Sequence, residues 1–268
     1  MARAIWSGAI SFGLVNVPVK LYPAVRSNTL RFHQLTREGQ RVRQKRVAGP
    51  SSEEVAWEDI VKGYELAPGQ YVLVDPEELD ALDPEASRTI DIEDFVELAD
   101  IDPIYYDRPY FLAPADAAAA RPYRLLVEAM QGTSKVAIAR FVMRTKQYLA
   151  ALRARDDVLV LSTMNYADEI VPLSEVDGLA AADQVEIRDR ELQMARQLIE
   201  SLTTPFEPGR YEDEYRLRVL ELIERRAAGE VLVSEPTVEQ APRVVDLMSA
   251  LEESLEAAKE RKDHQKAG

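Results

Sequence analysis

Bulky apolar residues alternate with small or polar ones at the start of the chain, a period that is typical of β-strands. They occupy even positions from Trp6 to Leu14 and odd positions from Val15 to Leu21. Successive side chains of a strand point to opposite faces. The switch of parity near Gly13 therefore predicts two strands joined by a bulge or bend.

A second alternating stretch, residues 41–47, is predicted to be a strand that carries Arg41, Arg43 and Lys45 on one face. Like charges placed side by side repel one another unless anions meet them from outside. Together with the opening strands, this pattern predicts that the first 50 residues are strands with short turns.

Shorter patterns predict a mixed region after residue 50. The expected elements are a short helix over 58–64, a strand over 72–74 and a helix that starts at 75–78. Two strands, 104–106 and 110–112, are expected on either side of a turn. A helix is expected over 115–131, with a kink or a break at Pro122. Three antiparallel strands follow at the spacing of a β-meander or barrel. They span 135–143, 147–153 and 158–164. On the first of them, Arg140 and Arg144 project from the face opposite Phe141 and Met143.

The rest of the chain changes to helical periodicity. Helices are predicted over 185–202 and 213–228, and the second ends at Gly229, a residue type that commonly terminates helices. A final amphipathic helix begins after Pro242 and carries a stripe of apolar side chains. The stripe consists of Val244, Met248, Leu251, Leu255 and Ala258. Residues 259–268 are short and of mixed charge, and we expect them to be disordered.

The composition is that of a folded protein, and it narrows the possible chemistry. The chain has 268 residues, of which 46% are hydrophobic, with no cysteine and two histidines. This apolar fraction excludes disorder of the whole chain. Without cysteine there is no disulfide framework, no thiolate catalysis and no cysteine-ligated metal. His33 and His264 lie far apart in sequence, which argues against a His-rich metal site or a histidine-based triad.

The net charge of −14 argues at first against a nucleic-acid partner, but the charges are segregated along the chain. Residues 1–50 contain nine basic residues and one acidic residue, Glu38, for a net charge of +8. Residues 121–155 contain eight basic residues against Glu128 alone, for +7, so the remainder carries −29. Either the cations form weak surface ion pairs with acidic neighbours, or a polyanion outside the chain neutralises them.

Motifs for nucleotide-binding loops, zinc proteases and nucleophile elbows are absent from the sequence. Carboxylates at 91–94 and 100–102 could serve a two-metal hydrolase, although solvated faces or helix starts are the favoured interpretation. His33 is predicted to be a packed or hydrogen-bonded structural residue, and Trp6 and Trp57 to be core residues. The sequence has no apolar run that could span a membrane and no signal-peptide pattern, so we expect a soluble cytoplasmic protein.

Several long segments resemble bacterial Ku proteins in the same order. They are 3–22 (RAIWSGAISFGLVNVPVKLY), 31–34 (RFHQ), 59–65 (DIVKGYE), 107–112 (DRPYFL), 148–153 (YLAALR) and 206–215 (FEPGRYEDEY). The resemblance extends over about residues 1–260. It departs from the family at two places. First, no cysteine lies near Ala48, where family members often have one, and its absence excludes a metal role for that loop. Second, the tail lacks the long Lys-rich extension of some members.

The resemblance implies an α+β fold in which a β-barrel and a strand-rich bridge form half of a ring, followed by a helical C-terminal arm. Residues 1–229 would form this core, and residues 230–268 a C-terminal region with one amphipathic helix and a short mixed-charge tail. The implied function is sequence-independent binding of double-stranded DNA ends by a ring-shaped homodimer in non-homologous end joining. The dimer would protect the ends and recruit a multifunctional ATP-dependent DNA ligase. Such a protein is not an enzyme, needs no cofactor and associates with the nucleoid at breaks.

A protein that accepts any broken end has to contact phosphates rather than bases. Charge segregation and strand parity give a hypothesis for the DNA-facing cations. They are Lys20, Arg26, Arg31, Arg41, Arg43, Lys45, Arg46, Arg140, Arg144 and Lys146. The stripe Val244, Met248, Leu251 and Leu255 is a candidate ligase-binding surface, or else it packs on the protein's own arm.

Helices 185–202 and 213–228 are candidate dimer elements, although ordinary core packing explains their apolar faces equally well. Two other functions stay open as alternatives. One is a metal-dependent nuclease that uses the carboxylates between 91 and 102. The other is a scaffold whose basic strands bind an acidic partner protein.

Overall fold

The structure is a computed structural model of the chain, and it describes residues 3–49, 53–75, 77–78, 88–144, 146–182, 185–229 and 247–266. The contacts between residues divide the chain into two compact units, Met1–Val171 and Pro172–Gly268. All strands found in the described residues belong to the first unit.

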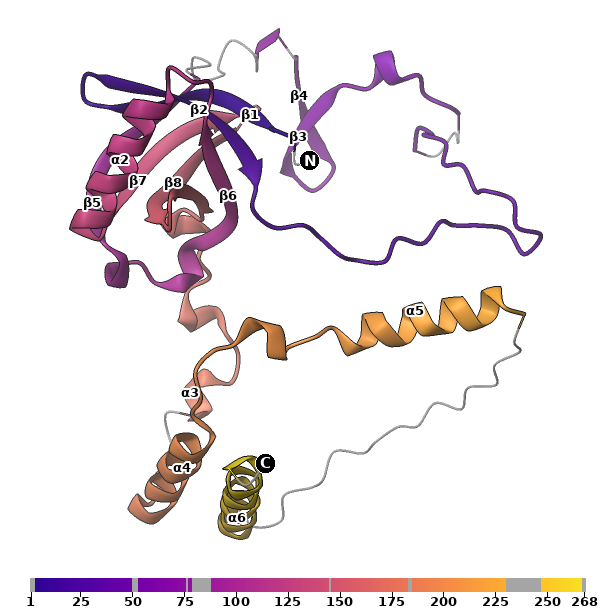
Figure 1. Cartoon of the computed structure of the whole chain (residues 1–268). Coiled ribbons are helices and arrows are strands. Elements are labelled where there is room, and N and C mark those ends of the chain that lie inside the picture. Colours follow the sequence, from indigo (N-terminus) through magenta and orange to yellow (C-terminus); the bar gives the residue numbers. More distant parts are fainter. Residues whose placement is uncertain are drawn as a thin grey trace. The chain divides into compact units, whose positions relative to one another are not determined.

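Seven strands close into a barrel in the first unit (Figure 1). They are β1 (Trp6–Phe12), β2 (Val15–Pro23), β5 (Thr89–Glu97), β6 (Tyr106–Pro114), β7 (Lys135–Met143), β8 (Lys146–Arg155) and β9 (Val158–Met164). The order around the barrel is β1-β2-β6-β9-β8-β7-β5. Neighbours are antiparallel except β5 and β1, whose parallel pairing closes the barrel. The α+β class with a β-barrel is confirmed, and the predicted meander corresponds to β7, β8 and β9.

The switch of parity near Gly13 is a hairpin turn. Phe12 pairs with Val15, so that two residues connect β1 to β2. Gly13 has a φ of 59°, a conformation that glycine adopts without a steric penalty. Ile10 and Val17 pair across the hairpin and are both buried. The two predicted strands and the bend between them are confirmed.

The interior of the barrel is packed with side chains from its strands. The buried residues of β7 in this core are Ala137, Ala139, Phe141 and Met143, which the sequence placed on one face of the strand. Trp6 packs edge-to-face on Phe141 at a centroid distance of 5.8 Å, and its Nε1 donates a hydrogen bond to the Val142 carbonyl at 2.9 Å. Trp6 therefore has the predicted core role.

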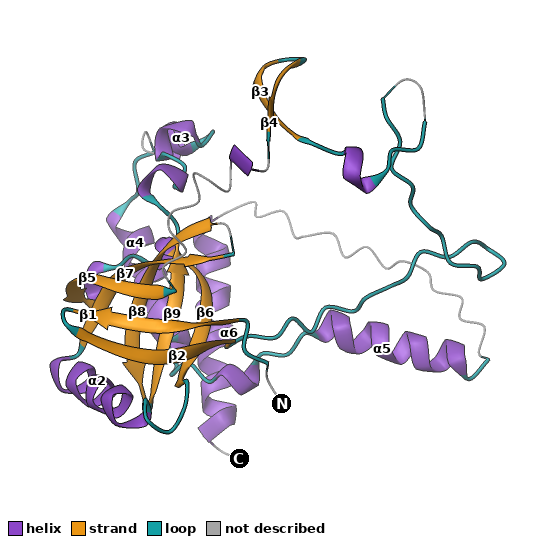
Figure 2. Cartoon of the chain, turned by 90° about the horizontal axis from the view of Figure 1, so that it is seen from above, coloured by secondary structure: helices purple, strands orange, loops and turns teal. Residues whose placement is uncertain are grey.

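Helix α2 (Ala120–Thr133) packs on the barrel, where it contacts β2, β6, β7 and β8 (Figure 2). The buried Tyr123 hydroxyl donates to the Leu112 carbonyl at 2.7 Å and accepts from the Leu159 amide at 2.9 Å. Pro122 lies in the first turn, where a helix does not need its N–H. The helix starts later than the predicted residue 115 and continues past Pro122 without a break.

The stretch after β2 differs from the prediction of strands up to residue 50. The predicted strand over 41–47 is wrong, because residues Leu35 and Arg41, and Val47 and Glu54, form only isolated bridges. The side chains of 41–47 are all exposed. No apolar face is therefore buried by pairing, and the neighbouring cations oppose it.

A separate hairpin follows this stretch. It consists of β3 (Lys62–Ala67) and β4 (Gln70–Val74), so the predicted strand over 72–74 is confirmed. The predicted helix over 58–64 is wrong, because a 3-10 turn at Trp57–Asp59 leads directly into β3. Residues 77–78 are helical, as predicted, and the rest of that predicted helix lies outside the described residues.

The two strands predicted on either side of a turn at 107–109 are a single strand, β6. An irregularity in its register with β9, between Tyr106 and Pro109, takes up the residues of the predicted turn. The Arg108 amide donates to the Thr163 hydroxyl at 3.1 Å, which in turn contacts the Asp107 carboxylate at 3.1 Å. A bulge held by these hydrogen bonds thus bends the strand without ending it.

The second unit is helical. It contains α3 (Leu179–Ala182), α4 (Asp189–Leu202), α5 (Glu214–Ala227) and α6 (Leu247–Lys266). Helix α4 starts later than the predicted residue 185. The Asp213 carboxylate caps α5 by accepting from the Arg216 amide at 2.9 Å, and Gly229 follows α5 with a φ of 87°, as predicted.

Helix α6 packs against α4 and continues to Lys266, so the expectation of disorder from residue 259 is wrong. The predicted domain boundary between residues 229 and 230 falls where a described range ends, and it stays a prediction. None of the helices within the described ranges combines the length and the apolar character that crossing a bilayer requires.

The replacement Gly8→Ala tests the close packing of β1 against residue 88. An added Cβ would lie 2.1 Å from the Arg88 carbonyl oxygen and 2.3 Å from the Trp6 ring. Because a backbone atom blocks the space, we expect a loss of about 3 kcal/mol or more in the free energy of unfolding, measured by urea denaturation. The matched control is Gly132→Ala in α2, where a Cβ meets no atom within 4 Å. Alanine there should stabilise the helix by about 0.5–1 kcal/mol, and equal stability of both variants would contradict the argument.

Candidate nucleic-acid interface

Most predicted DNA-facing cations of residues 1–50 lie on an exposed stretch with little regular structure, whereas Lys20 lies on β2. A narrow turn organises part of this stretch. The Thr36 amide donates to the Gln40 carbonyl at 2.8 Å, and the Val42 amide donates to the Gln34 carbonyl at 3.0 Å. These hydrogen bonds place the residues just before the turn beside those just after it.

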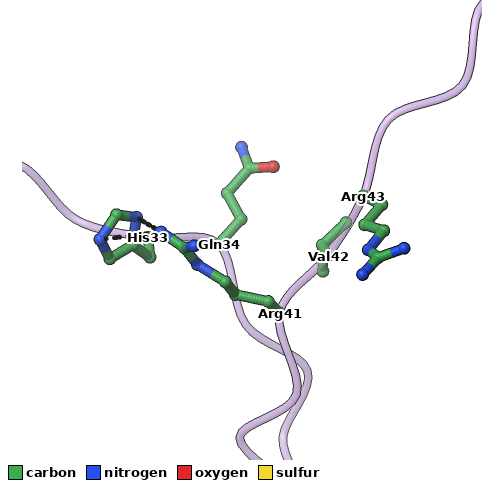
Figure 3. Close-up of a pocket in the computed structure, with 5 residues that line it drawn as sticks. All are labelled: His33, Gln34, Arg41, Val42 and Arg43. Atoms are coloured by element: carbon green, nitrogen blue, oxygen red, sulfur yellow. Dashed lines mark hydrogen bonds between the residues drawn. The ribbon is translucent and has the colours of Figure 1, made fainter.

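Arg41 reaches across this turn to His33 (Figure 3). Its Nη2 atom lies 2.9 Å from Nδ1 and 3.2 Å from Nε2 of the imidazole. His33, Gln34, Arg41, Val42 and Arg43 line a shallow cavity of about 340 Å³ that has no acidic residue in its wall. His33 is hydrogen-bonded, as predicted, but it is exposed and belongs to a cluster of cations.

The two following cations have partners of different kinds. The Lys45 Nζ lies 2.7 Å from a carboxylate oxygen of Glu54 in an exposed ion pair. The guanidinium of Arg46 lies 4.3 Å from the centroid of the Trp57 ring, a cation–π contact. Trp57 is 72% exposed, so the predicted core role of this residue is wrong.

The second basic segment, 121–155, is largely neutralised by neighbouring carboxylates. Five of its eight cations form ion pairs, namely Arg124 with Glu128 and Asp157, Lys135 with Glu97, Arg140 with Glu93, Lys146 with Glu169, and Arg155 with Asp156. Sequence reasoning could not identify these partners, because most of them come from strands or turns that are distant along the chain.

Arg140 has the most complete of these ion pairs. Its Nε and Nη2 atoms donate to the two carboxylate oxygens of Glu93 at 2.5 and 2.9 Å. Glu93 lies on β5 at the irregularity in its pairing with β7, and Arg140 lies on β7. These hydrogen bonds lower the pKa of the Glu93 carboxyl and raise that of Arg140, since both favour the charged forms.

Arg144 and Lys146 lie at the end of β7 and the start of β8. Arg144 is exposed and has a φ of 62°, which places it in the turn between the strands. The Lys146 Nζ lies 3.6 Å from Glu169 and 5.4 Å from the centroid of the Tyr148 ring. The pKa of Glu169 is lowered, first by a hydrogen bond from the Tyr166 amide and also by Lys146.

The two basic segments thus differ in how far their charge is neutralised. Within the described part of residues 1–50, Lys45 is the one cation in an ion pair with a carboxylate. Exposed guanidinium and ammonium groups without such partners are the donors that phosphate oxygens prefer. Of the two explanations for the segregated charge, pairing with acidic neighbours therefore fits residues 121–155, and attraction of an external polyanion fits residues 20–46.

Several carboxylates between 91 and 102 have hydrogen-bond partners within the chain. Thr89 donates its hydroxyl to Asp91 at 2.9 Å, and Asp102 caps a 3-10 turn by accepting from the Ile104 amide at 2.9 Å. Glu93 binds Arg140. In the described ranges, no three His, Asp or Glu side chains come together in an arrangement that could hold a metal ion.

The predicted partner-binding stripe lies on α6 only in part. Val244 falls outside the described residues. Met248 and Leu251 are partly buried, and Leu255 is 9% exposed on the helix that packs against α4. Packing within the chain thus accounts for Leu255, and the partner-binding role of the stripe stays a prediction.

Comparisons with known proteins point to one family. The family described as the Ku70/Ku80 beta-barrel domain matches residues 11–194. A protein from Anaeromyxobacter sp. (strain K), named non-homologous end joining protein Ku, is 50% identical over 100% of this chain and 90% of its own length.

Two further relatives agree. Non-homologous end joining protein Ku 1 from Saccharopolyspora erythraea is 47% identical over 97% of this chain and 80% of its own length. A protein from Desulfitobacterium hafniense with the name non-homologous end joining protein Ku is 44% identical over 99% of this chain and 91% of its own length. Among solved structures, the SPOC domain of human PHD-finger protein 3 gives a TM-score of 0.31 at 12% identity, over 60% of this chain and 95% of that domain.

Proposed function

The chain belongs to the Ku family, and we propose that it binds the ends of double-stranded DNA without regard to sequence and acts in non-homologous end joining. The observation that carries this proposal is the set of cations in residues 20–46, which are exposed except for the half-buried Lys20 and of which only Lys45 has a carboxylate partner among the described residues. The names of its relatives support the pathway.

Phosphate contacts fit this function better than base contacts. Phosphates have nearly the same geometry in every sequence, so a protein that reads them accepts any broken end. The proposed contacts are those predicted from the sequence, and the cations among them that have no carboxylate partner in the described residues should contribute most. They are Lys20, Arg26, Arg31, Arg41, Arg43, Arg46 and Arg144.

We further propose that two chains form a ring around the DNA as a homodimer and recruit a multifunctional ATP-dependent DNA ligase. One chain that supplies half of a ring requires a second copy, and two-fold symmetry is the simplest closed arrangement. Leu217, Leu222 and Ile223 of α5 are 42–48% exposed, which makes α5 a candidate dimer element. The candidate ligase contact is the stripe on α6, with Met248 and Leu251 as its less buried members.

Linear and closed-circular forms of the same duplex distinguish end binding from other modes of attachment. We expect retention of the linear form in a gel-shift assay without added metal, and no cleavage. Cleavage that requires Mg²⁺ would indicate a nuclease, and equal binding of both forms would contradict end recognition. A chain that binds neither form would support the alternative of a protein scaffold.

The salt dependence of binding measures the number of phosphate contacts. If the bound protein neutralises about 6–10 phosphates, affinity should fall about 10³–10⁵-fold between 50 and 200 mM salt. The double replacement of Arg43 and Lys45 by alanine should flatten the plot of log affinity against log salt, by about 0.9 for Arg43 and by less for Lys45, which is paired with Glu54. A double replacement of Arg124 and Arg155 by alanine is the control and should leave the slope unchanged. An unchanged slope for the first variant would remove Arg43 and Lys45 from the interface.

The ion pair between Arg140 and Glu93 gives a test of the second basic segment. Glu93→Gln releases the guanidinium of Arg140 from its carboxylate, so we expect tighter DNA binding if Arg140 faces the DNA. The matched control is Glu97→Gln on the same strand, which removes one negative charge and frees Lys135, a residue outside the proposed set. Equal gains in affinity for both variants, measured by fluorescence anisotropy, would show a general charge effect and exclude Arg140.

A further inference from the structure

We propose that His33, Gln34, Arg41 and Arg43 form a binding site for one phosphate group of the DNA backbone, and that His33 takes up a proton when the phosphate binds. This inference rests on the proposed function and adds to it a residue that binds phosphate and a coupling between binding and pH.

The backbone around the turn brings the four residues to one cavity. The hydrogen bonds from Thr36 to Gln40 and from Val42 to Gln34 hold the two arms of the turn together. Figure 3 shows the guanidinium of Arg41 directed at the imidazole of His33. The cavity of about 340 Å³ is wide enough for a phosphate group, and Arg43 also lines it. In this structure the guanidinium of Arg43 points away from His33 and Arg41, so it would have to turn toward a bound phosphate (Figure 3).

The contact between His33 and Arg41 limits where the imidazole can carry a proton in the free protein. A guanidinium has only donors, so the ring nitrogen that it contacts at 2.9 Å has to accept. A protonated ring nitrogen has no lone pair to offer, so this hydrogen bond and a proton on the same nitrogen exclude each other. Either tautomer leaves one acceptor, since both ring nitrogens lie within 3.2 Å of the same Nη2 atom.

The charged residues that line the cavity beside His33 are cations, and they favour binding of an anion there. Arg41 and Arg43 are the charged residues in the cavity wall. The nearest acidic residue in sequence, Glu38, is engaged by the Thr36 hydroxyl, which lowers the pKa of its carboxyl. A proton on His33 would place a second positive charge next to the Arg41 guanidinium, and an anion in the cavity would compensate both charges.

A phosphate in the cavity reverses this balance. Its oxygens accept hydrogen bonds from Arg41 and Arg43, and Arg41 then no longer donates to His33. The ring nitrogen that Arg41 leaves accepts a proton from the solvent. The resulting N–H donates to the phosphate, which also compensates the new positive charge. Binding of one phosphate is thus linked to uptake of about one proton per chain.

Binding of a blunt-ended linear duplex at constant ionic strength between about pH 6 and pH 8, where imidazoles titrate, tests this linkage. The wild-type affinity should rise as the pH falls, by up to about tenfold per pH unit for one proton taken up. His33→Gln, which keeps a neutral polar side chain, should bind weakly at every pH. His33→Lys, which supplies a permanent cation, should bind tightly and without this pH dependence. The control His264→Gln should behave like the wild type.

Proton uptake by His33 can be followed directly by NMR, because the chain has only two histidines and their signals are easily assigned. In the His264→Gln variant the imidazole NMR signal belongs to His33 alone. We expect the midpoint of its pH titration to move upward when the duplex is added, and to move less with inorganic phosphate at the same ionic strength. A larger shift with inorganic phosphate would assign the cavity to a free anion and overturn the proposal.

The outcomes separate this inference from the proposed function. If the wild type and His33→Gln bind the duplex with the same pH dependence, the phosphate site at His33 is wrong and end binding stands. If the wild type does not bind linear duplex at any pH, the proposed function itself fails, and the site at His33 fails with it.

Discussion

Cations held close together without acidic partners raise the free energy of a protein, and a polyanion that comes among them lowers it. Residues 20–46 are in this situation, since only Lys45 has a carboxylate partner among the described residues of the segment. Interactions between exposed charges are screened over about 10 Å at 0.1 M salt. A phosphate near this segment therefore responds to its +7 charge and hardly to the −14 of the whole chain. The acidic surface elsewhere disfavours binding of DNA in other places.

The strands of the barrel hold the cations of the second basic segment in fixed positions beside carboxylates, whereas most cations of the first segment lie outside regular structure. In the register of β7 and β5, Arg140 lies opposite Asp91 and Lys135 lies opposite Glu97. The ion pairs are those of Arg140 with Glu93 and of Lys135 with Glu97. Neighbouring strands thus supply carboxylates opposite the cations of β7. Exposed ion pairs of this kind contribute little to stability, so a phosphate can replace a carboxylate at little cost in stability.

The regular part of the fold could be predicted from the sequence, and the irregular part could not. Strands β7, β8 and β9 follow from alternation and tight turns, because these signals lie within neighbouring residues. The strand predicted over 41–47 failed, since alternation alone gives no partner strand and no buried face. The candidate cations were found by charge counting. Their neutralisation was not, because a pair such as Glu93 and Arg140 is set by the register of strands far apart in sequence.

The two kinds of cation should also contribute differently to the salt dependence of binding. A free cation that neutralises a phosphate releases a counterion from the DNA, and this release makes affinity fall with salt. When a paired cation exchanges a carboxylate for a phosphate, the freed carboxylate attracts a cation of its own. The net release of ions is then smaller, although the hydrogen bonds to the phosphate are the same. If the proposed contacts form, the slope of affinity against salt should count mainly the cations of residues 20–46 that have no carboxylate partner among the described residues, while contacts of Arg140 and Lys146 would depend less on salt.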